Sequence, residues 1–155
     1  MEFFGYKIKK INHLFKSRLD RNLEQLDITV AQMQTLIYLF KDNGKKVTQK
    51  QLAEYFSVKH STMSGILKRL QEKELIEICI DEENKKYKNI YTTTKAVELN
   101  EKLETYRNET EALLVKGFSE EEIEQLASFL DRLYINLNSE LSDKEIKCFN
   151  KEMKQ

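Results

Sequence analysis

The chain has 155 residues, of which 40% are hydrophobic and 34% are charged, with no proline and only four glycines. A chain of this length buries one core, or one core and an oligomer interface, and is short for two independent domains. The scarcity of helix breakers predicts a mainly α-helical protein. We expect it in the cytoplasm and away from membranes, because no run of about 18 apolar residues and no secretory signal occurs.

The same composition disfavours an enzyme or a metal centre. Cys79 and Cys148 lie far apart without a CxxC pair, which indicates neither a disulfide framework nor a zinc finger. No phosphate-binding loop, nucleophile elbow or HExxH motif occurs, and the two histidines match no nucleophile or metal set. We therefore expect no catalytic site, no metal and no cofactor.

The net charge is zero, but the charge is unevenly distributed along the chain. Residues 41–95 hold twelve Lys/Arg against eight Asp/Glu, whereas residues 96–155 hold eight against fourteen. A basic middle followed by an acidic C-terminal third is typical of a DNA-binding protein with a separate assembly region, because only the DNA-binding face has to neutralise phosphates. Ordinary solvated charge is the alternative, and the charge pattern alone does not decide.

The chain opens with two predicted helices. Residues 3–26 carry apolar side chains at every third or fourth position, which predicts a long amphipathic helix that needs a partner surface. Thr29 is the expected N-cap of a second helix, which is apolar nearly all round and should therefore be central. We expect this helix to run to Phe40 and to stop at Asn43-Gly44.

Two short helices follow. Thr48 and Gln51 have the spacing of a capping box and open the first of them. A tight turn over residues 57–60 leads to the second, which is expected over residues 61–73. Two short helices separated by a few residues form a helix-turn-helix.

Residues 75–80 and 87–93 predict an antiparallel strand pair, because they alternate in character and are rich in β-branched side chains. The intervening residues 81–86, DEENKK, are expected to form a solvated hairpin tip.

Two long helices complete the prediction. The first is expected from Thr94 to about residue 116, with Gly117 ending it. Ser119 and Glu122 form another capping box, which opens a helix with a heptad-like apolar seam that should be buried against another helix. Residues 142–153 are expected to add a terminal helix. The seam consists of Ile123, Leu126, Leu130, Leu133 and Leu137.

The order helix, helix, helix-turn-helix, hairpin and two long helices resembles the multiple-antibiotic-resistance repressor (MarR) family of dimeric winged-helix regulators. The most specific part is LAEYFSVKHSTMSGILKRLQEKELIE, followed by the hairpin. Asp81, Asn84, Lys85 and Lys86 keep the family's spacing in the hairpin, although Asn84 and Lys86 replace the usual Asp and Arg of a wing brace. Glu74 stands where the family usually has glycine, so that helix end must either be less relaxed or be closed by another residue.

The resemblance implies a mainly α fold with a small β-wing. Residues 29–94 would form the winged helix-turn-helix DNA-binding lobe, and residues 1–28 with 95–155 the helical dimerisation region. A homodimer would present two recognition helices about 34 Å apart to a palindrome. An intramolecular helical bundle is the alternative use of the apolar stripes.

The candidate DNA contacts lie on the fourth helix and the hairpin. Small polar residues at the start of a recognition helix let it approach base edges, and lysines beside them reach phosphates or guanines. The candidates are Lys59, His60, Ser61, Thr62, Ser64, Gly65, Lys68, Lys85 and Lys86. His60 and Arg69 each have two possible roles. His60 either contacts DNA or caps the turn, and Arg69 either contacts DNA or forms an ion pair.

Relatives implied by the resemblance also bind an effector between the dimerisation helices and the DNA-binding lobe. The candidate lining residues are His13, Phe15, Tyr38 and Tyr106, although aromatic residues at helical spacing also serve as core. We therefore expect a dimeric repressor that binds double-stranded DNA at a palindromic operator and takes a small-molecule ligand. The alternative is a winged-helix architectural or protein-interaction module without a sequence-specific operator.

Overall fold

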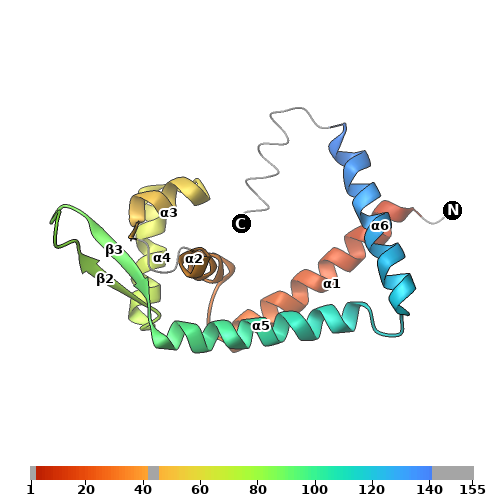
Figure 1. The fold of residues 1–155 in the computed structure, drawn as a ribbon, viewed down its shortest axis with the longest axis horizontal. Helices are drawn as coiled ribbons and strands as arrows, with labels where there is room; N and C mark the ends of the chain where they lie inside the picture. Colours follow the sequence, from red (N-terminus) through yellow and green to blue (C-terminus); the bar gives the residue numbers. More distant parts are fainter. Residues whose placement is uncertain (1–2, 42–45, 141–155) are drawn as a thin grey trace. The chain divides into compact units, whose positions relative to one another are not determined.

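The computed structural model describes residues 3–41 and 46–140, and it confirms the mainly helical fold with a small β-wing. Figure 1 shows the elements in chain order. They are α1 (Phe4–Gln25), α2 (Val30–Lys41), β1 (Val47–Thr48), α3 (Gln49–Phe56), α4 (His60–Glu72), β2 (Ile76–Ile80), β3 (Lys88–Thr92), α5 (Thr94–Leu114) and α6 (Glu120–Asn138). The predicted stop at Asn43-Gly44, the predicted terminal helix over residues 142–153 and Cys148 lie outside the described residues.

The chain divides into two compact units, Met1–Glu101 and Lys102–Gln155, with the boundary inside α5. In the first unit, α2, α3 and α4 gather beside the β2–β3 hairpin (Figure 1). The antiparallel sheet has the strand order β1-β3-β2. The hairpin register pairs Ile78 with Ile90 and Ile80 with Lys88. The short strand β1, which sequence reasoning missed, pairs Val47 with Ile90 on the other edge of β3.

The core of the first unit forms where the apolar faces of α2, α3, α4 and the sheet meet. On α4, Met63, Leu67 and Leu70 recur at spacings of four and three, so they share one face and are all buried. The predicted central position of α2 is confirmed by buried Leu36 and Leu39. The largest fully buried side chains are Leu36, Leu52, Met63, Leu67, Leu70, Ile76 and Thr35.

Reciprocal side-chain caps open the helices where the sequence predicted them. The Thr48 and Ser119 hydroxyls accept hydrogen bonds from the backbone of Gln51 and Glu122, whose side chains bond back to the cap. The predicted cap Thr29 has a partner that the sequence analysis overlooked. The Gln32 side chain accepts from the Thr29 N–H at 3.2 Å, which explains how a glutamine is buried in the core.

The start of α4 needs correction, whereas its C-terminal end is less relaxed, as one of the two alternatives predicted. The helix begins at His60, not Ser61, so the turn before it ends one residue earlier than predicted. Its C-terminal end closes without glycine, because Glu74 adopts the left-handed conformation (φ 60°) that glycine would adopt more easily. The Leu75 N–H bonds the Leu70 carbonyl and the Glu74 N–H bonds the Gln71 carbonyl, both at 2.9 Å, which is the Schellman pattern.

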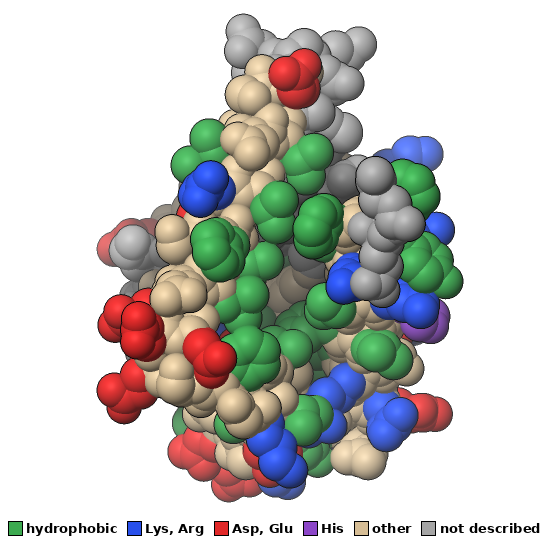
Figure 2. Space-filling view, turned by 90° about the vertical axis from the view of Figure 1, so that its right-hand side faces the viewer, with side chains coloured by type: hydrophobic (Ala, Val, Ile, Leu, Met, Phe, Trp, Pro, Cys, Tyr) green, Lys and Arg blue, Asp and Glu red, His purple; other side chains and the backbone are tan. Residues whose placement is uncertain are grey.

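The long helices leave much apolar surface uncovered. In the described chain, α6 has no buried residue, and its seam residues Leu130 and Leu137 are 53% and 69% exposed. On α1, Phe4 and Leu14 are 75% and 69% exposed. Figure 2 shows hydrophobic side chains reaching the surface among the charged ones. Even so, no described helix combines the length and the apolar character needed to span a membrane.

Candidate nucleic-acid interface

The exposed face of α4 carries the predicted base-reading residues. At about 100° per residue, Ser61, Ser64, Gly65 and Lys68 fall on the side of the helix opposite buried Met63. All four are exposed, as is Thr62 at the edge of the face. A side-chain Cβ added at Gly65 would meet nothing within 4 Å, so the packing of the chain itself does not require glycine there.

The N-terminal end of α4 is held by α3. The Gln49 Nε2 lies 3.1 Å from the His60 Nδ1 and 3.1 Å from the His60 carbonyl oxygen, to which it donates. When the ring nitrogen Nδ1 accepts, neutral His60 carries its proton on Nε2 and can donate it outward. Lys59 precedes the helix as its N-cap residue without a side-chain cap and is exposed.

Two further basic residues of α4 face the solvent. The Lys68 Nζ lies 3.9 Å from a Glu72 carboxylate oxygen, an exposed pair that is worth little in water. Among the described residues, the exposed side chain of Arg69 has no hydrogen-bond or ion-pair partner. The structural ion pair considered for Arg69 is therefore not found in the described chain.

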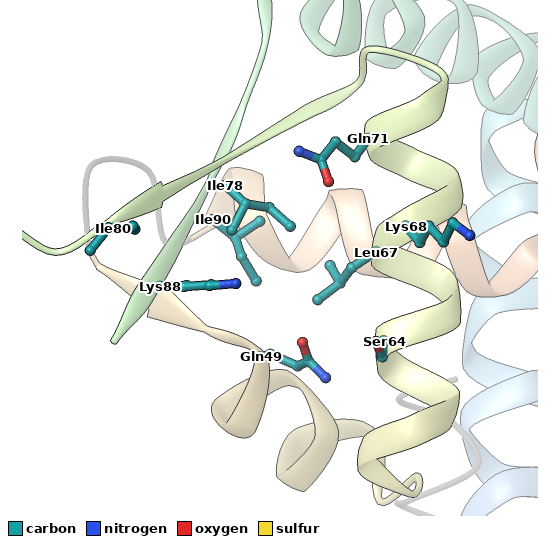
Figure 3. Close-up of a pocket in the computed structure, with 9 residues that line it drawn as sticks. All are labelled: Gln49, Ser64, Leu67, Lys68, Gln71, Ile78, Ile80, Lys88 and Ile90. Carbon is teal, nitrogen blue, oxygen red and sulfur yellow. The ribbon is translucent and has the colours of Figure 1, made fainter. Parts of the chain in front are cut away.

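A groove of about 490 Å³ separates α4 from the sheet. Its floor is aliphatic, with Leu67 from the helix and Ile78 and Ile90 from the hairpin (Figure 3). Predicted residues Ser64 and Lys68 border it, together with polar residues that sequence reasoning missed. These are Gln49, Gln71 and Lys88.

The wing tip is partly solvated and partly ordered by a buried carboxylate. Lys85 and Lys86 are exposed, as predicted for phosphate contacts. Asp81, by contrast, is only 8% exposed, so the expectation of a solvated tip over residues 81–86 is right for residues 82–86 and wrong for Asp81. Its Oδ1 accepts from the backbone N–H groups of Glu83 and Asn84 at 2.9 and 3.0 Å.

The other oxygen of Asp81 ties the tip to the sheet. Its Oδ2 accepts from Asn89 Nδ2 at 2.8 Å and lies 3.0 Å from the Lys46 Nζ, which also pairs with Glu83 at 3.3 Å. A brace is therefore present although the family's second Asp and Arg are replaced. Sequence reasoning missed it because Lys46 stands just before β1 and reaches the hairpin only through the fold.

These contacts keep the Asp81 carboxylate charged. Hydrogen bonds from Asn89 and from the Asn84 backbone, followed by the Lys46 contact, hold the pKa of Asp81 well below its ordinary value. The hydrogen bonds to Asp81 and Glu83 raise the pKa of Lys46 in turn. The wing tip therefore carries an ionised carboxylate throughout the neutral range.

The four candidate effector residues occupy different surroundings. His13 and Phe15 are both exposed on α1, where two positions apart means about 200° around the helix. Tyr38 packs in an aromatic cluster with Tyr55, whose ring centroid is 4.4 Å away. Tyr106 is half-buried and belongs to the second unit.

Comparison with known proteins agrees with this geometry. A family model described as the MarR family matches residues 26–86, which run from the end of α1 to the wing tip. YybA of Bacillus subtilis strain 168, an uncharacterised HTH-type transcriptional regulator, is 28% identical over 114 residues, covering 74% of this chain and 75% of that protein.

Solved structures of MepR from Staphylococcus aureus are similar over a larger part of the chain. The MepR–DNA complex matches with a TM-score of 0.78 and 34% identity, covering 86% of this chain and 99% of MepR. MepR bound to ethidium bromide matches with a TM-score of 0.70 and 34% identity, covering 88% and 97%.

Proposed function

The chain belongs to the MarR family of transcription regulators, and on this premise we propose that it is a homodimeric repressor that binds a palindromic operator. Its relatives are regulators and not enzymes. MepR, at 34% identity, is a relative seen in complex with DNA. We place the protein in the cytoplasm, because a repressor has to reach chromosomal DNA.

The exposed face of α4 is the observation that carries the proposal. Ser61, Ser64 and Gly65 give its N-terminal half small side chains, so the helix can approach base edges in the major groove. Lys59 and His60 lie at the helix start, where partial positive charge favours a phosphate. Lys85 and Lys86 at the wing tip would reach the backbone beside it.

Dimerisation is supported by the surface of the long helices. Most apolar side chains of α6 are exposed in the described chain, and a second copy would cover them. A two-fold dimer would present its α4 helices to half-sites about one helical turn apart, which explains why the operator should be palindromic. Residues 29–94 then serve as the DNA-binding lobe, and residues 1–28 and 95–155 as the dimerisation region.

We further propose that a small molecule relieves repression, with MepR bound to ethidium bromide as the supporting precedent. A ligand changes DNA binding only if its affinity differs between the two protein conformations. His13, Phe15, Tyr38 and Tyr106 are the residues to test for ligand contact.

A non-specific architectural or protein-interaction module is the competing function. Such a module would bind DNA weakly, lose it steeply as salt rises, and favour no site. The small polar face of α4 favours the sequence reader, because backbone binding alone would not need a glycine on the exposed helix face.

Selection of bound duplexes from a random DNA pool at near-physiological salt tests the proposal. We expect enrichment of an inverted repeat with half-sites about 10 base pairs apart. Binding without enrichment, which vanishes as salt rises, would favour the architectural module instead.

A further inference from the structure

Lys88 is a cation on the otherwise apolar inner face of the wing. On β3 it alternates with Ile90, and across the hairpin it pairs with Ile80. Within the described residues its side chain has neither a hydrogen bond nor an ion pair, whereas Lys46 and Lys95 each pair with a carboxylate. Figure 3 shows the Lys88 side chain pointing into the groove toward α4.

The groove around Lys88 suits an anion. As far as the described chain lines it, the groove contains no carboxylate, and Gln71 and Ser64 of α4 add side chains that can donate hydrogen bonds (Figure 3). Gln49 is not counted among these donors, because its Nε2 already contacts two atoms of His60. We therefore treat Gln49 as a positioning residue for the start of α4.

The outer face of the same hairpin has the opposite character. A hollow of about 300 Å³ there is lined by Asp81, Glu82 and Glu83, with Lys46 as the cation that pairs with the first and the last of them. Carboxylates repel phosphates, so a polyanion can approach the inner face of the hairpin more easily than the outer face.

We propose that the groove between α4 and β3 holds a sugar–phosphate segment of one DNA strand, with Lys88 and Gln71 as backbone contacts. The exposed side chain of Ile80 and the half-buried side chain of Ile78 would contact deoxyribose, and the Lys88 ammonium would neutralise a phosphate. The groove borders Ser64 and Lys68, so it is continuous with the exposed face of α4. This inference rests on the proposed function and adds a contact that positions DNA without reading its sequence.

The test is the salt dependence of DNA binding by Lys88→Gln, with Lys102→Gln as the matched control. Lys102 is an exposed lysine of α5 whose replacement removes the same charge outside the groove. Binding is measured to the selected operator and to a random duplex over a range of salt. We expect Lys88→Gln to lower the slope of log K against log salt by about one per protomer, and so by about two per dimer, on both duplexes. Lys102→Gln should keep the wild-type slope.

Two further variants sharpen the assignment. Lys88→Arg keeps the charge and should keep the slope, and Glu82→Gln on the outer face should leave it unchanged. A wild-type slope in Lys88→Gln, or a steeper slope in Glu82→Gln, would overturn the proposed placement of the DNA strand. If the wild-type protein binds the selected operator no more tightly than the random duplex, the proposed function itself is contradicted. The two failures are therefore distinguishable.

Discussion

The winged-helix lobe buries an apolar core within one chain, whereas helix α6 leaves most of its apolar residues uncovered in the described chain. In the lobe, α2, α3, α4 and the sheet bury Leu36, Leu52 and Met63 almost completely within one chain. In the described chain, α6 buries no residue, although its seam is as regular as that of any lobe helix.

This difference separates two kinds of amphipathic pattern. A lobe helix finds its partner surface in the same chain, whereas α6 needs a surface that the described part of a single chain does not offer it. Burying apolar area is worth about 25 cal/mol per Å², so α6 would gain stability from a second copy. The lobe should therefore respond to mutations through folding and DNA binding, and α6 through assembly.

The largest effect is expected from charges in the α6 seam. In the double variant Leu130→Glu/Leu133→Glu, the two-fold axis buries each new charge twice, so we expect a loss of at least about 4 kcal/mol, roughly a thousandfold, in dimer affinity. Sedimentation equilibrium measures it, with Glu121→Gln in the first turn of α6 as the control. An unchanged dimer dissociation constant would show that the α6 seam does not lie in the dimer interface.

Removing core volume from the lobe should act on folding. Met63 is fully buried on α4, so Met63→Ala should lower the free energy of unfolding by about 2–5 kcal/mol. Urea denaturation measures this change. Lys68→Ala, on the exposed face of the same helix, should stay within about 0.5 kcal/mol of wild type, and equal costs for both variants would contradict the orientation of α4.

A charge on the exposed face of α4 should act on DNA binding alone. Ser64→Glu places a carboxylate where base edges and phosphates would lie, so we expect operator binding to weaken by about 2 kcal/mol or more per protomer. The dimer constant and the unfolding midpoint should match wild type. Operator affinity retained in this variant would refute the placement of α4 in the major groove.

The Asp81 brace predicts an acid-sensitive contribution to stability. The folded-state pKa of Asp81 is depressed, so its contribution is complete above the unfolded pKa of about 3.9 and is lost as pH falls below it. Asp81→Asn should be less stable than wild type at pH 7, and the gap should narrow below about pH 4. Thermal unfolding at pH 7 and below about pH 4 measures the difference in stability between wild type and Asp81→Asn. A difference that does not change with pH would contradict the depressed pKa of Asp81.

The smallest effect is expected from Gly65→Ala, which should stabilise the fold but weaken operator binding. Gly65→Ala should raise the free energy of unfolding by about 0.5–1 kcal/mol, because glycine weakens a helix interior and the new methyl group meets nothing in the chain. The same methyl group should weaken operator binding, since it occupies the face that approaches DNA. Unchanged binding, measured by titration of the operator, would place Gly65 outside the interface.

Local patterns predicted most of the fold and the exposed face of α4. Helix periodicity and capping pairs such as Thr48 with Gln51 depend on residues close in sequence, so they can be recognised before the chain folds. The strand β1 was missed because two residues are too short to show alternation.

The features that sequence reasoning missed depend on contacts between distant segments. The burial of Asp81 requires Lys46 from the other edge of the sheet and Asn89 from the next strand. Lys88 did leave a signal, since a lysine alternates with Ile90 on a strand face that should be apolar. The proposed contact of Lys88 with DNA depends on α4, which forms the opposite wall of the groove.

The mass of the protein–DNA complex on one operator duplex tests the central claim most directly. If α6 and the other long helices join two lobes, sedimentation equilibrium should give two wild-type chains bound to one palindromic duplex. On a duplex that holds a single half-site, the variant Leu130→Glu/Leu133→Glu should bind as one chain. A single wild-type chain bound to the full palindrome would contradict the division of labour between the lobe and α6.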